Sequence, residues 1–431
     1  MEHESAERVC DSSGAWRTWL LIGATGFGGP AGQMAILHRE VVERKKWLDE
    51  EEFLAAMRLC MLLPGPEAQQ LATYAGWRLQ GLAGGLLAGT LFVLPGALLV
   101  TALAWLHAAG ESVPLIAAAF AGTRPAVVAL VALAAWRIGR KSIRSTAAAV
   151  IAVVALAALA AGVPFPLVVV VAGIVGWLLP LDLATSAHGK PPASEQTPQA
   201  ELSESAARPR TAAVRWALAI AGGGCLVWMA CYAVVRWLDL AGGAGPAIAT
   251  LFTETTLLSL GGAYAVVPWA LDESVARGWL EPAERFDALA MGEATPGPLI
   301  LVVTFIGFLA GWKTGAEGVA TAGLEGAAIA TLFAFIPSFA MVLALAPLVR
   351  SIRAGSRLGR AMTAIGAAVV AAIVLLGIRL AAGALFPQGS PQAVPLLVAA
   401  VCGVVLAMGR ASTPAVVLAA AAIGMLASVV R

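Results

Sequence analysis

Three short motifs occur twice in this chain, in the same order and at nearly the same spacing. They are Phe27-Gly28-Gly29-Pro30, Trp47-Leu48 and Pro64-Gly65-Pro66 in the first half, and Leu260-Gly261-Gly262, Trp279-Leu280 and Pro296-Gly297-Pro298 in the second. From the tryptophan to the Pro-Gly-Pro the offset between the copies is 232 residues, and it is one residue longer at the glycine pair. The chain is therefore predicted to contain two copies of one unit, each with two hydrophobic segments interrupted by glycine or proline.

The composition indicates that both units lie in a membrane. Hydrophobic residues make up 59% of the chain and charged residues 13%, whereas a soluble domain has roughly 45–50% and about 25%. Uncharged apolar runs over residues 147–161, 167–181, 393–408 and 416–430 approach the length that a bilayer requires. Since backbone groups in lipid must be satisfied within each segment, we expect an all-α polytopic membrane protein. With each interrupted segment counted once, about 13 hydrophobic segments are predicted.

The hydrophobic pattern divides the chain into five parts. We predict a polar N-terminal tail over residues 1–15, a first repeat over 16–181, a flexible cytoplasmic linker over 182–211, an additional transmembrane helix over 212–236 and a second repeat over 246–431. The linker is rich in Ser, Pro, Ala, Glu and Gln, a composition that does not form a packed core. The tail is not followed by the short apolar core and cleavage site of a removable signal peptide, so we expect none.

The distribution of positive charge predicts that the second repeat is inverted relative to the first. Four cations follow one span of the first repeat, and four cations precede the equivalent span of the second. They are Arg137, Arg140, Lys141 and Arg144 in the first repeat, and Arg350, Arg353, Arg357 and Arg360 in the second. Positively charged loops remain in the cytoplasm, so the two repeats are expected to cross in opposite directions, with the N-terminus cytoplasmic and the C-terminus external.

The segment around the first Pro-Gly-Pro, residues 53–79, has two interpretations. As a re-entrant hairpin that turns at Pro64-Gly65-Pro66, it leaves the cations of residues 39–46 in the cytoplasm, which the charge rule favours. As a single crossing, it exports those cations. The run Glu50-Glu51-Glu52, which precedes the segment, is assigned to a polar loop.

The interrupted segments form the candidate binding site. Proline removes a backbone donor and glycine adopts conformations closed to other residues, so each break ends one helix and starts another. The free N–H groups and positive dipole at a helix start favour an anion, although such a kink can also serve packing alone. The candidate substrate-binding residues are Thr25, Phe27, Gly28, Gly29, Pro30, Pro64, Gly65, Pro66, Gln69, Gln70, Thr73, Arg124, Gly261, Gly262, Thr295, Pro296, Gly297 and Pro298. For the two glutamines, helix–helix hydrogen bonding is an equally good interpretation.

Three charged residues in apolar surroundings are candidates for a role in transport. Glu67 directly follows the first Pro-Gly-Pro, and Glu293 lies three residues before the second. A buried carboxylate has to be paired or protonatable, so coupling of proton movement to transport is the predicted role of both, with repulsion of an anion as the alternative for Glu67. Arg124 precedes Pro125 within an apolar span. It is expected to contact the substrate or a gate, or to pair with a carboxylate such as Glu67.

Other chemistry is not indicated by the sequence. The four histidines, His3, His38, His107 and His188, lack the spacing of metal ligands, and no phosphate-binding glycine loop is present. We therefore predict no cofactor, no metal and no enzymatic activity, so that transport has to run on a gradient. The five cysteines are interpreted as small apolar residues. The net charge of +2 gives no indication of nucleic-acid binding.

Further motifs extend both repeats. In the first half they are His38-Arg39-Glu40-Val41-Val42, the run 63–70, Tyr74-Ala75-Gly76-Trp77-Arg78 and Phe92-Val93-Leu94-Pro95-Gly96; in the second they are Gly278-Trp279-Leu280, the run 293–299 and Phe305-Ile306-Gly307-Phe308. With the duplicated landmarks, they closely resemble the chromate ion transporter family over nearly the whole chain. Leu260 departs from the family pattern, which prefers Phe before the glycine pair, so the first break of the second repeat is the weaker ligand candidate.

The resemblance implies a two-domain protein of the bacterial inner (plasma) membrane that exports chromate by means of the membrane potential or a proton gradient. Chromate is a sulfate-like tetrahedral dianion, which helix starts and hydroxyl groups can coordinate. A secondary active transporter that works by alternating access is therefore expected. The alternatives are an oxyanion channel and a transporter of sulfate or another anion with the same architecture. Selectivity, the coupling ion and whether two chains form a homodimer are left open.

Overall fold

The structure is a computed structural model and describes residues 14–110, 113–178, 210–260, 262–315, 319–349, 356–386 and 392–430. Within these ranges every regular element is helical and there is no strand. Five helices are long and apolar enough to cross a membrane, and five shorter apolar helices accompany them. The expected all-α polytopic membrane fold is thereby confirmed. The predicted linker lies almost entirely outside the described residues.

The helices occur in two equivalent series. The first consists of α1 (Ala15–Thr25), α2 (Gly29–His38), a π-helical turn (Arg39–Arg44), α3 (Glu50–Leu62), α4 (Glu67–Gly110), α5 (Pro114–Ser142), α6 (Thr146–Ala160) and α7 (Phe165–Leu178). Then comes α8 (Arg210–Trp237). The second consists of α9 (Gly245–Leu257), α10 (Ala263–Ala276), α11 (Glu284–Ala294), a 3₁₀ turn (Leu299–Leu301), α12 (Val302–Thr314), α13 (Val319–Leu345), α14 (Ser356–Leu385), α15 (Ala393–Ala407) and α16 (Thr413–Val430).

Helix α4 is the counterpart of two helices in the second series. Its backbone leaves the helical conformation at Gln80 and at Gly81, where φ is +66°. Glycine alone takes such a φ without strain, so the residue pair separates a short first arm from a long second arm. The first arm corresponds to α12 and the second to α13.

Each Pro-Gly-Pro is the turn of a helical hairpin. Glu52, near the start of α3, accepts hydrogen bonds from Tyr74 Oη at 2.8 Å and Arg78 Nε at 2.5 Å, near the end of the first arm of α4. The two helices are therefore antiparallel, and the structure shows the hairpin rather than a single crossing. In the second repeat, Glu284 at the start of α11 pairs with Lys313 near the end of α12, at 2.5 Å. Glu284 follows Glu52 by the repeat offset of 232 residues, so the same position closes both hairpins.

The assignment of Glu50-Glu51-Glu52 to a polar loop is wrong. These residues form the first turn of α3, and Asp49 caps that turn by accepting the N–H of Glu52 at 2.7 Å. Acidic residues are favourable at a helix start because they oppose its positive dipole end. Glu52 is also buried, since it turns inward to its partners on α4.

The two hairpins enter from opposite sides of the membrane. The open end of the first hairpin contacts Arg78, just before the second arm of α4. The open end of the second contacts His107, near the end of that arm, with His107 Nε2 3.6 Å from Glu284 Oε1. At 1.5 Å per residue the arm rises about 40 Å between these contacts, more than the roughly 30 Å hydrocarbon core of a bilayer. The two repeats are therefore inverted relative to each other.

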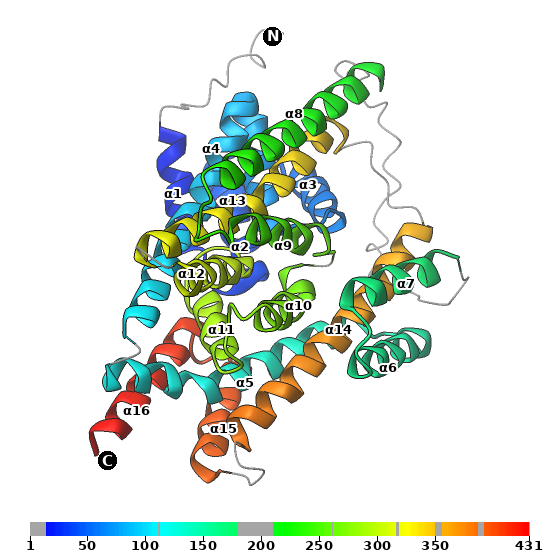
Figure 1. Ribbon diagram of the computed structural model, residues 1–431. Coiled ribbons are helices and arrows are strands. Elements are labelled where there is room, and N and C mark those ends of the chain that lie inside the picture. Colours follow the sequence, from blue (N-terminus) through cyan, green and yellow to red (C-terminus); the bar gives the residue numbers. More distant parts are fainter. Residues whose placement is uncertain are drawn as a thin grey trace.

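The two repeats also exchange helices. α5 packs against α15 and α16 of the second repeat, and α14 packs against α6 and α7 of the first. Such reciprocal contacts are what a twofold relation produces. The result is two bodies, which we name the hairpin bundle (α1–α4 and α8–α13) and the outer bundle (α5–α7 and α14–α16). Figure 1 shows α5, α15 and α16 below the hairpin bundle, and α6 and α7 to its lower right.

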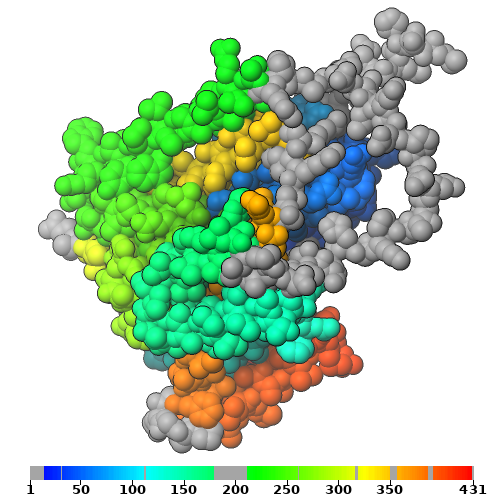
Figure 2. All heavy atoms as spheres, turned by 90° about the vertical axis from the view of Figure 1, so that its right-hand side faces the viewer, coloured from blue at the N-terminus to red at the C-terminus, as the bar shows by residue number. Residues whose placement is uncertain are grey.

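The periphery of the molecule is apolar, as a lipid-facing surface requires. α6 and α7 lie side by side on one face (Figure 2) and enclose a groove lined by Val150, Val154, Leu167 and Val171 together with other almost wholly apolar side chains. α8 lies along α13 with most of its own surface exposed.

Candidate functional site

All four predicted breaks interrupt helices in the structure. Gly28 and Gly29 have φ of +91° and +67° between α1 and α2, and Gly65 has φ of +121° between α3 and α4. In the second repeat Gly262 has φ of +101° before α10, and Gly297 has φ of +95° after α11. These conformations need glycine, which explains the residue type at each break. Gly261 lies outside the described residues.

The glycine-pair break of the first repeat contacts the Pro-Gly-Pro of the second. The N–H of Gly297 donates to the carbonyl of Gly26 at 3.1 Å. Gln33, a buried residue of α2, donates from Nε2 to the carbonyls of both Gly297, at 2.6 Å, and Gly26, at 3.2 Å. One amide side chain thus holds two breaks from different repeats together.

The other two breaks make the equivalent contact. The N–H of Gly65 donates to Ser259 Oγ at 2.8 Å, and Ser259 occupies the position in the second repeat that Gly26 occupies in the first. A Cβ on Gly262 would lie 3.6 Å from Glu67 Oε1. The carboxylate of Glu67 therefore faces the start of α10.

The tips of both hairpins reach the middle of long helices of the opposite repeat. A Cβ on Gly96, near the centre of the second arm of α4, would lie within 3.0 Å of the Pro296 carbonyl oxygen. A Cβ on Gly65 would lie 2.8 Å from Ser338 Oγ in α13. Gly96 and Ser338 each follow a proline within their helix, so the two contacts are equivalent. The four breaks consequently meet near mid-depth.

The polar residues predicted after the first tip form a buried network behind it. Ser338 Oγ donates to Gln69 Oε1 at 2.7 Å, and Gln69 Nε2 donates to Thr73 Oγ1 at 2.9 Å. Gln70 Nε2 donates to the carbonyl of Pro64 at 2.8 Å, while its buried Oε1 has no hydrogen-bond partner among the described residues. These contacts brace the tip. Gln69 accepts a hydrogen bond from α13, as the helix–helix interpretation expects, whereas Gln70 bonds to the tip of its own hairpin.

The remaining predicted residues differ in what they can offer an anion. The hydroxyl groups of Thr25 and Thr295 donate to the carbonyls of Leu21 and Met291 within their own helices, both at 2.7 Å. These two hydroxyl protons are already used, and the backbone N–H groups at helix starts are the candidate donors nearby. Gly29 is one such start, and none of the described residues lies within 4 Å of where its Cβ would be. Phe27 is exposed and Pro30, in the first turn of α2, is partly buried, whereas Pro66 and Pro298 are buried next to their tip glycines.

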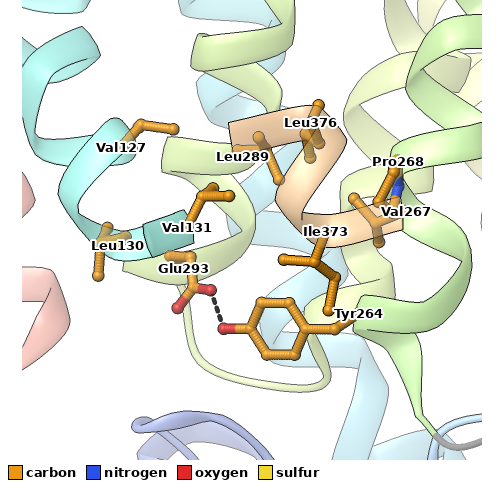
Figure 3. A pocket seen from close by; sticks show the side chains of 10 residues that line it. All are labelled: Val127, Leu130, Val131, Tyr264, Val267, Pro268, Leu289, Glu293, Ile373 and Leu376. Carbon is orange, nitrogen blue, oxygen red and sulfur yellow. Dashed lines mark hydrogen bonds between the residues drawn. The ribbon is translucent and has the colours of Figure 1, made fainter. Parts of the chain in front are cut away.

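Glu293 lies in an apolar cavity between the two bundles (Figure 3). It accepts a hydrogen bond from the Tyr264 hydroxyl, and side chains from α5, α10, α11 and α14 surround the pair. The cavity has room for roughly one water molecule. A tetrahedral oxyanion does not fit there.

Arg124 lies on α5, and its buried Nε has no hydrogen-bond partner among the described residues. Its charge acts on Asp287 of α11. The cation that acts on Glu67 is Lys141. The suggested pair of Arg124 with Glu67 is therefore not found among the described residues.

Comparison with known proteins identifies the family of the chain. The sequence profile described as "Chromate transporter" matches residues 14–177 and 246–425. The chain belongs to the chromate transporter family. Among its relatives, the chromate transport protein of Pseudomonas aeruginosa is 31% identical over 82% of this chain and 77% of its own length. The chromate transport protein of Cupriavidus metallidurans is 27% identical over 76% and 72%, and an uncharacterized transporter of Methanocaldococcus jannaschii is 26% identical over 78% and 76%. No solved structure matches.

Three residues of the site in this chromate transporter family member are missing from the candidates that the sequence provides: Gln33, Ser259 and Ser338. The two serines stand at positions that the repeat identifies: Ser259 is the counterpart of Gly26, and Ser338 follows Pro337 as Gly96 follows Pro95. Comparison of the two copies beyond the identical motifs is the signal that identifies both. Within the described residues no group of three or more His, Cys, Asp or Glu could hold a metal ion.

Proposed function

We propose that this protein is a secondary active transporter that exports chromate across the bacterial inner membrane by alternating access, with the N-terminus cytoplasmic and the C-terminus external. Membership of the chromate transporter family supports the substrate. The observation that carries the proposal is the reciprocal pairing of the four breaks, Gly26 with Gly297 and Ser259 with Gly65. It brings helix starts from both repeats to one depth, where their N–H groups can coordinate a dianion.

The proposed binding groups are the backbone N–H groups at the starts of α2, α4 and α10 and after the second tip. Gln33, Gln69 and Ser338 hold these starts in position. Arg124 is a proposed substrate or gate contact, and Glu67 and Glu293 are proposed coupling groups. A substrate with two negative charges requires hydrogen-bond donors or positive charges to stabilise it inside the membrane. The driving force in this proposal is the membrane potential or the proton gradient.

The first experiment measures chromate uptake into everted membrane vesicles. Export by the intact cell becomes uptake in this preparation, so vesicles with the protein should accumulate more chromate than vesicles without it, and collapsing the proton gradient and potential should abolish the difference. An unchanged difference after collapse would contradict active transport. A sulfate competition series in the same vesicles measures selectivity between the two oxyanions.

A second experiment distinguishes a transporter from an oxyanion channel. Purified protein in liposomes loaded with unlabelled chromate should concentrate labelled chromate transiently by counterflow, because an alternating-access carrier returns preferentially with substrate bound. A channel gives no counterflow and produces unitary currents. The hydrogen bonds that join each hairpin tip to the opposite repeat support the carrier.

A further inference from the structure

A second polar cluster lies at the far end of α4, away from the four breaks. His107 of α4 faces Glu284 and Asp287 of α11, with Nε2 3.6 Å from Glu284 Oε1 and 3.9 Å from Asp287 Oδ2. Lys313 of α12 pairs with Glu284, and Arg124 of α5 acts on Asp287. His107, Glu284 and Asp287 are 8%, 4% and 2% exposed. Four helices thus bring five titratable or charged groups together, three of them buried.

The cluster has unused hydrogen-bonding capacity. Four buried atoms have no hydrogen-bond partner among the described residues: His107 Nε2, Arg124 Nε, Glu284 Oε1 and Asp287 Oδ1. The other oxygen of Glu284, Oε2, is occupied by Lys313 and by the N–H of Glu281. Buried polar atoms without partners are costly and rare, so their concentration at one place calls for a functional explanation.

Closing the hairpin does not require this cluster. At the same position in the first repeat, Glu52 is held by Tyr74 and Arg78, and the counterpart of Asp287 is Ala55. Both hairpins have the closing glutamate, but a histidine at the position of His107 and a carboxylate at the position of Asp287 are present only at the second hairpin. One salt bridge of Glu284 with Lys313 would serve the structural purpose.

We propose that this cluster is a further proton-binding site of the transporter, in addition to Glu67 and Glu293, with His107 Nε2 as the acceptor. This inference rests on the proposed function and adds a third proton-binding position to it. With His107 neutral, two carboxylates and two cations balance; a proton taken from water on the external side makes His107 a cation that pairs with Asp287 and Glu284. No bond other than the N–H bond forms, and the proton leaves to water on the cytoplasmic side.

The geometry gives the proton a mechanical effect. His107 is held between the rings of Phe120 and Phe305, with centroids 4.6 and 5.4 Å away. It lies in the hairpin bundle with Asp287, whereas Arg124 lies in the outer bundle. A protonated His107 beside Asp287 weakens the attraction between Asp287 and the charge of Arg124, and so weakens the electrostatic coupling of the two bundles. α16, which also packs on α5 and α11, has no titratable side chain.

The test compares His107→Gln and Asp287→Asn with the wild type in everted vesicles and in liposomes. An artificial gradient with the vesicle interior at about pH 6 and the outside at about pH 8 spans the usual titration of histidine. It should accelerate chromate uptake by the wild type but not by either variant, while counterflow at equal pH persists in all three. The matched control is His38→Gln. His38 also meets two carboxylates, Glu50 at 2.6 Å and Glu43 at 3.2 Å, but at the surface; it should respond like the wild type.

Each outcome decides the proposal. Acceleration that survives in both variants, or that is absent from the wild type, would overturn the proton site but not the transporter. Absent counterflow in the wild type would overturn the proposed function itself. For a variant that loses counterflow, the melting midpoint of the purified protein at about pH 6 and about pH 8 is compared. The pH-dependent difference should be smaller in His107→Gln than in His38→Gln, and equal differences would refute the site.

Discussion

The contact between the second hairpin tip and α4 yields a prediction that depends directly on the pairing of the repeats. Gly96 lies within the second arm of α4, and a Cβ there would come within 3.0 Å of the Pro296 carbonyl oxygen and 2.6 Å from Leu301 Cδ1. The oxygen belongs to a backbone turn that is itself fixed by the Gly297 hydrogen bond to Gly26. Gly96→Ala therefore forces the tip away from α4.

The magnitude follows from a comparison of two helical glycines. Overpacking a well-packed contact costs typically 1–3 kcal/mol. At Gly223 of α8, none of the described residues lies within 4 Å of the place that an added methyl group would take, so alanine should instead stabilise the helix by roughly 0.5–1 kcal/mol. The two glycine-to-alanine changes should therefore differ by about 1.5–4 kcal/mol, which is at least a factor of about ten in the folded-to-unfolded ratio.

The assay is thermal unfolding of the purified variants in detergent, followed by chromate uptake in everted vesicles. Gly96→Ala should melt below the wild type and transport less, because the tip carries the proposed binding groups. Gly223→Ala should melt at or above the wild type and transport normally. Equal midpoints and equal uptake for the two variants would refute the close approach of the tip to α4.

Three further predictions concern the tips and the inverted arrangement. Gln33→Ala removes the two side-chain hydrogen bonds to the first pair of breaks, leaves the backbone bond from Gly297 to Gly26, and should cost about 1–3 kcal/mol. It should lower the melting midpoint and reduce uptake; wild-type behaviour would contradict its bridging role. Ser259→Ala leaves the buried N–H of Gly65 in the first Pro-Gly-Pro without an acceptor, at a similar cost. Its control is Ser274→Ala, which should be close to neutral because the Ser274 hydroxyl donates only to a carbonyl of its own helix. In a cysteine-free background, Arg78→Cys and Ala108→Cys should react with a membrane-impermeant thiol reagent from opposite sides, and labelling of both from one side would refute the inverted repeats.

The helix breaks can be predicted from the sequence because their cause is local. A glycine forced to positive φ or a proline without an N–H acts on its own neighbours, so Gly28, Gly65, Gly262 and Gly297 can be identified without knowledge of the fold. The inverted repeat can also be predicted, because the charge asymmetry across a membrane is visible in the loops. The structure supports it independently, through the contacts of Arg78 and His107 with opposite hairpins.

Partners cannot be predicted from spacing alone. The sequence suggests Glu67 as a carboxylate for Arg124, but Arg124 interacts with Asp287, because α5 packs against α11. Glu52 belongs to an acidic run that indicates a polar loop, and only the return of α4 past α3 explains why it is buried. Both errors concern which helices lie side by side, a property of tertiary packing that no local pattern contains.

The exchanged packing determines which parts of the molecule can move against each other. Because α5 packs on α15 and α16 while α14 packs on α6 and α7, neither repeat can rotate as a unit without breaking its contacts with the other. The separable bodies are therefore the hairpin bundle and the outer bundle. Glu293 and Tyr264 lie at their contact in a cavity for a single water, and the charge of Arg124 on α5 acts on Asp287 of α11. The tips, in contrast, are hydrogen-bonded within the hairpin bundle. Alternating access by rocking at the bundle contact would thus open a path to the tips while preserving the pairing that forms them, and the groups able to change charge lie on the surface that has to move.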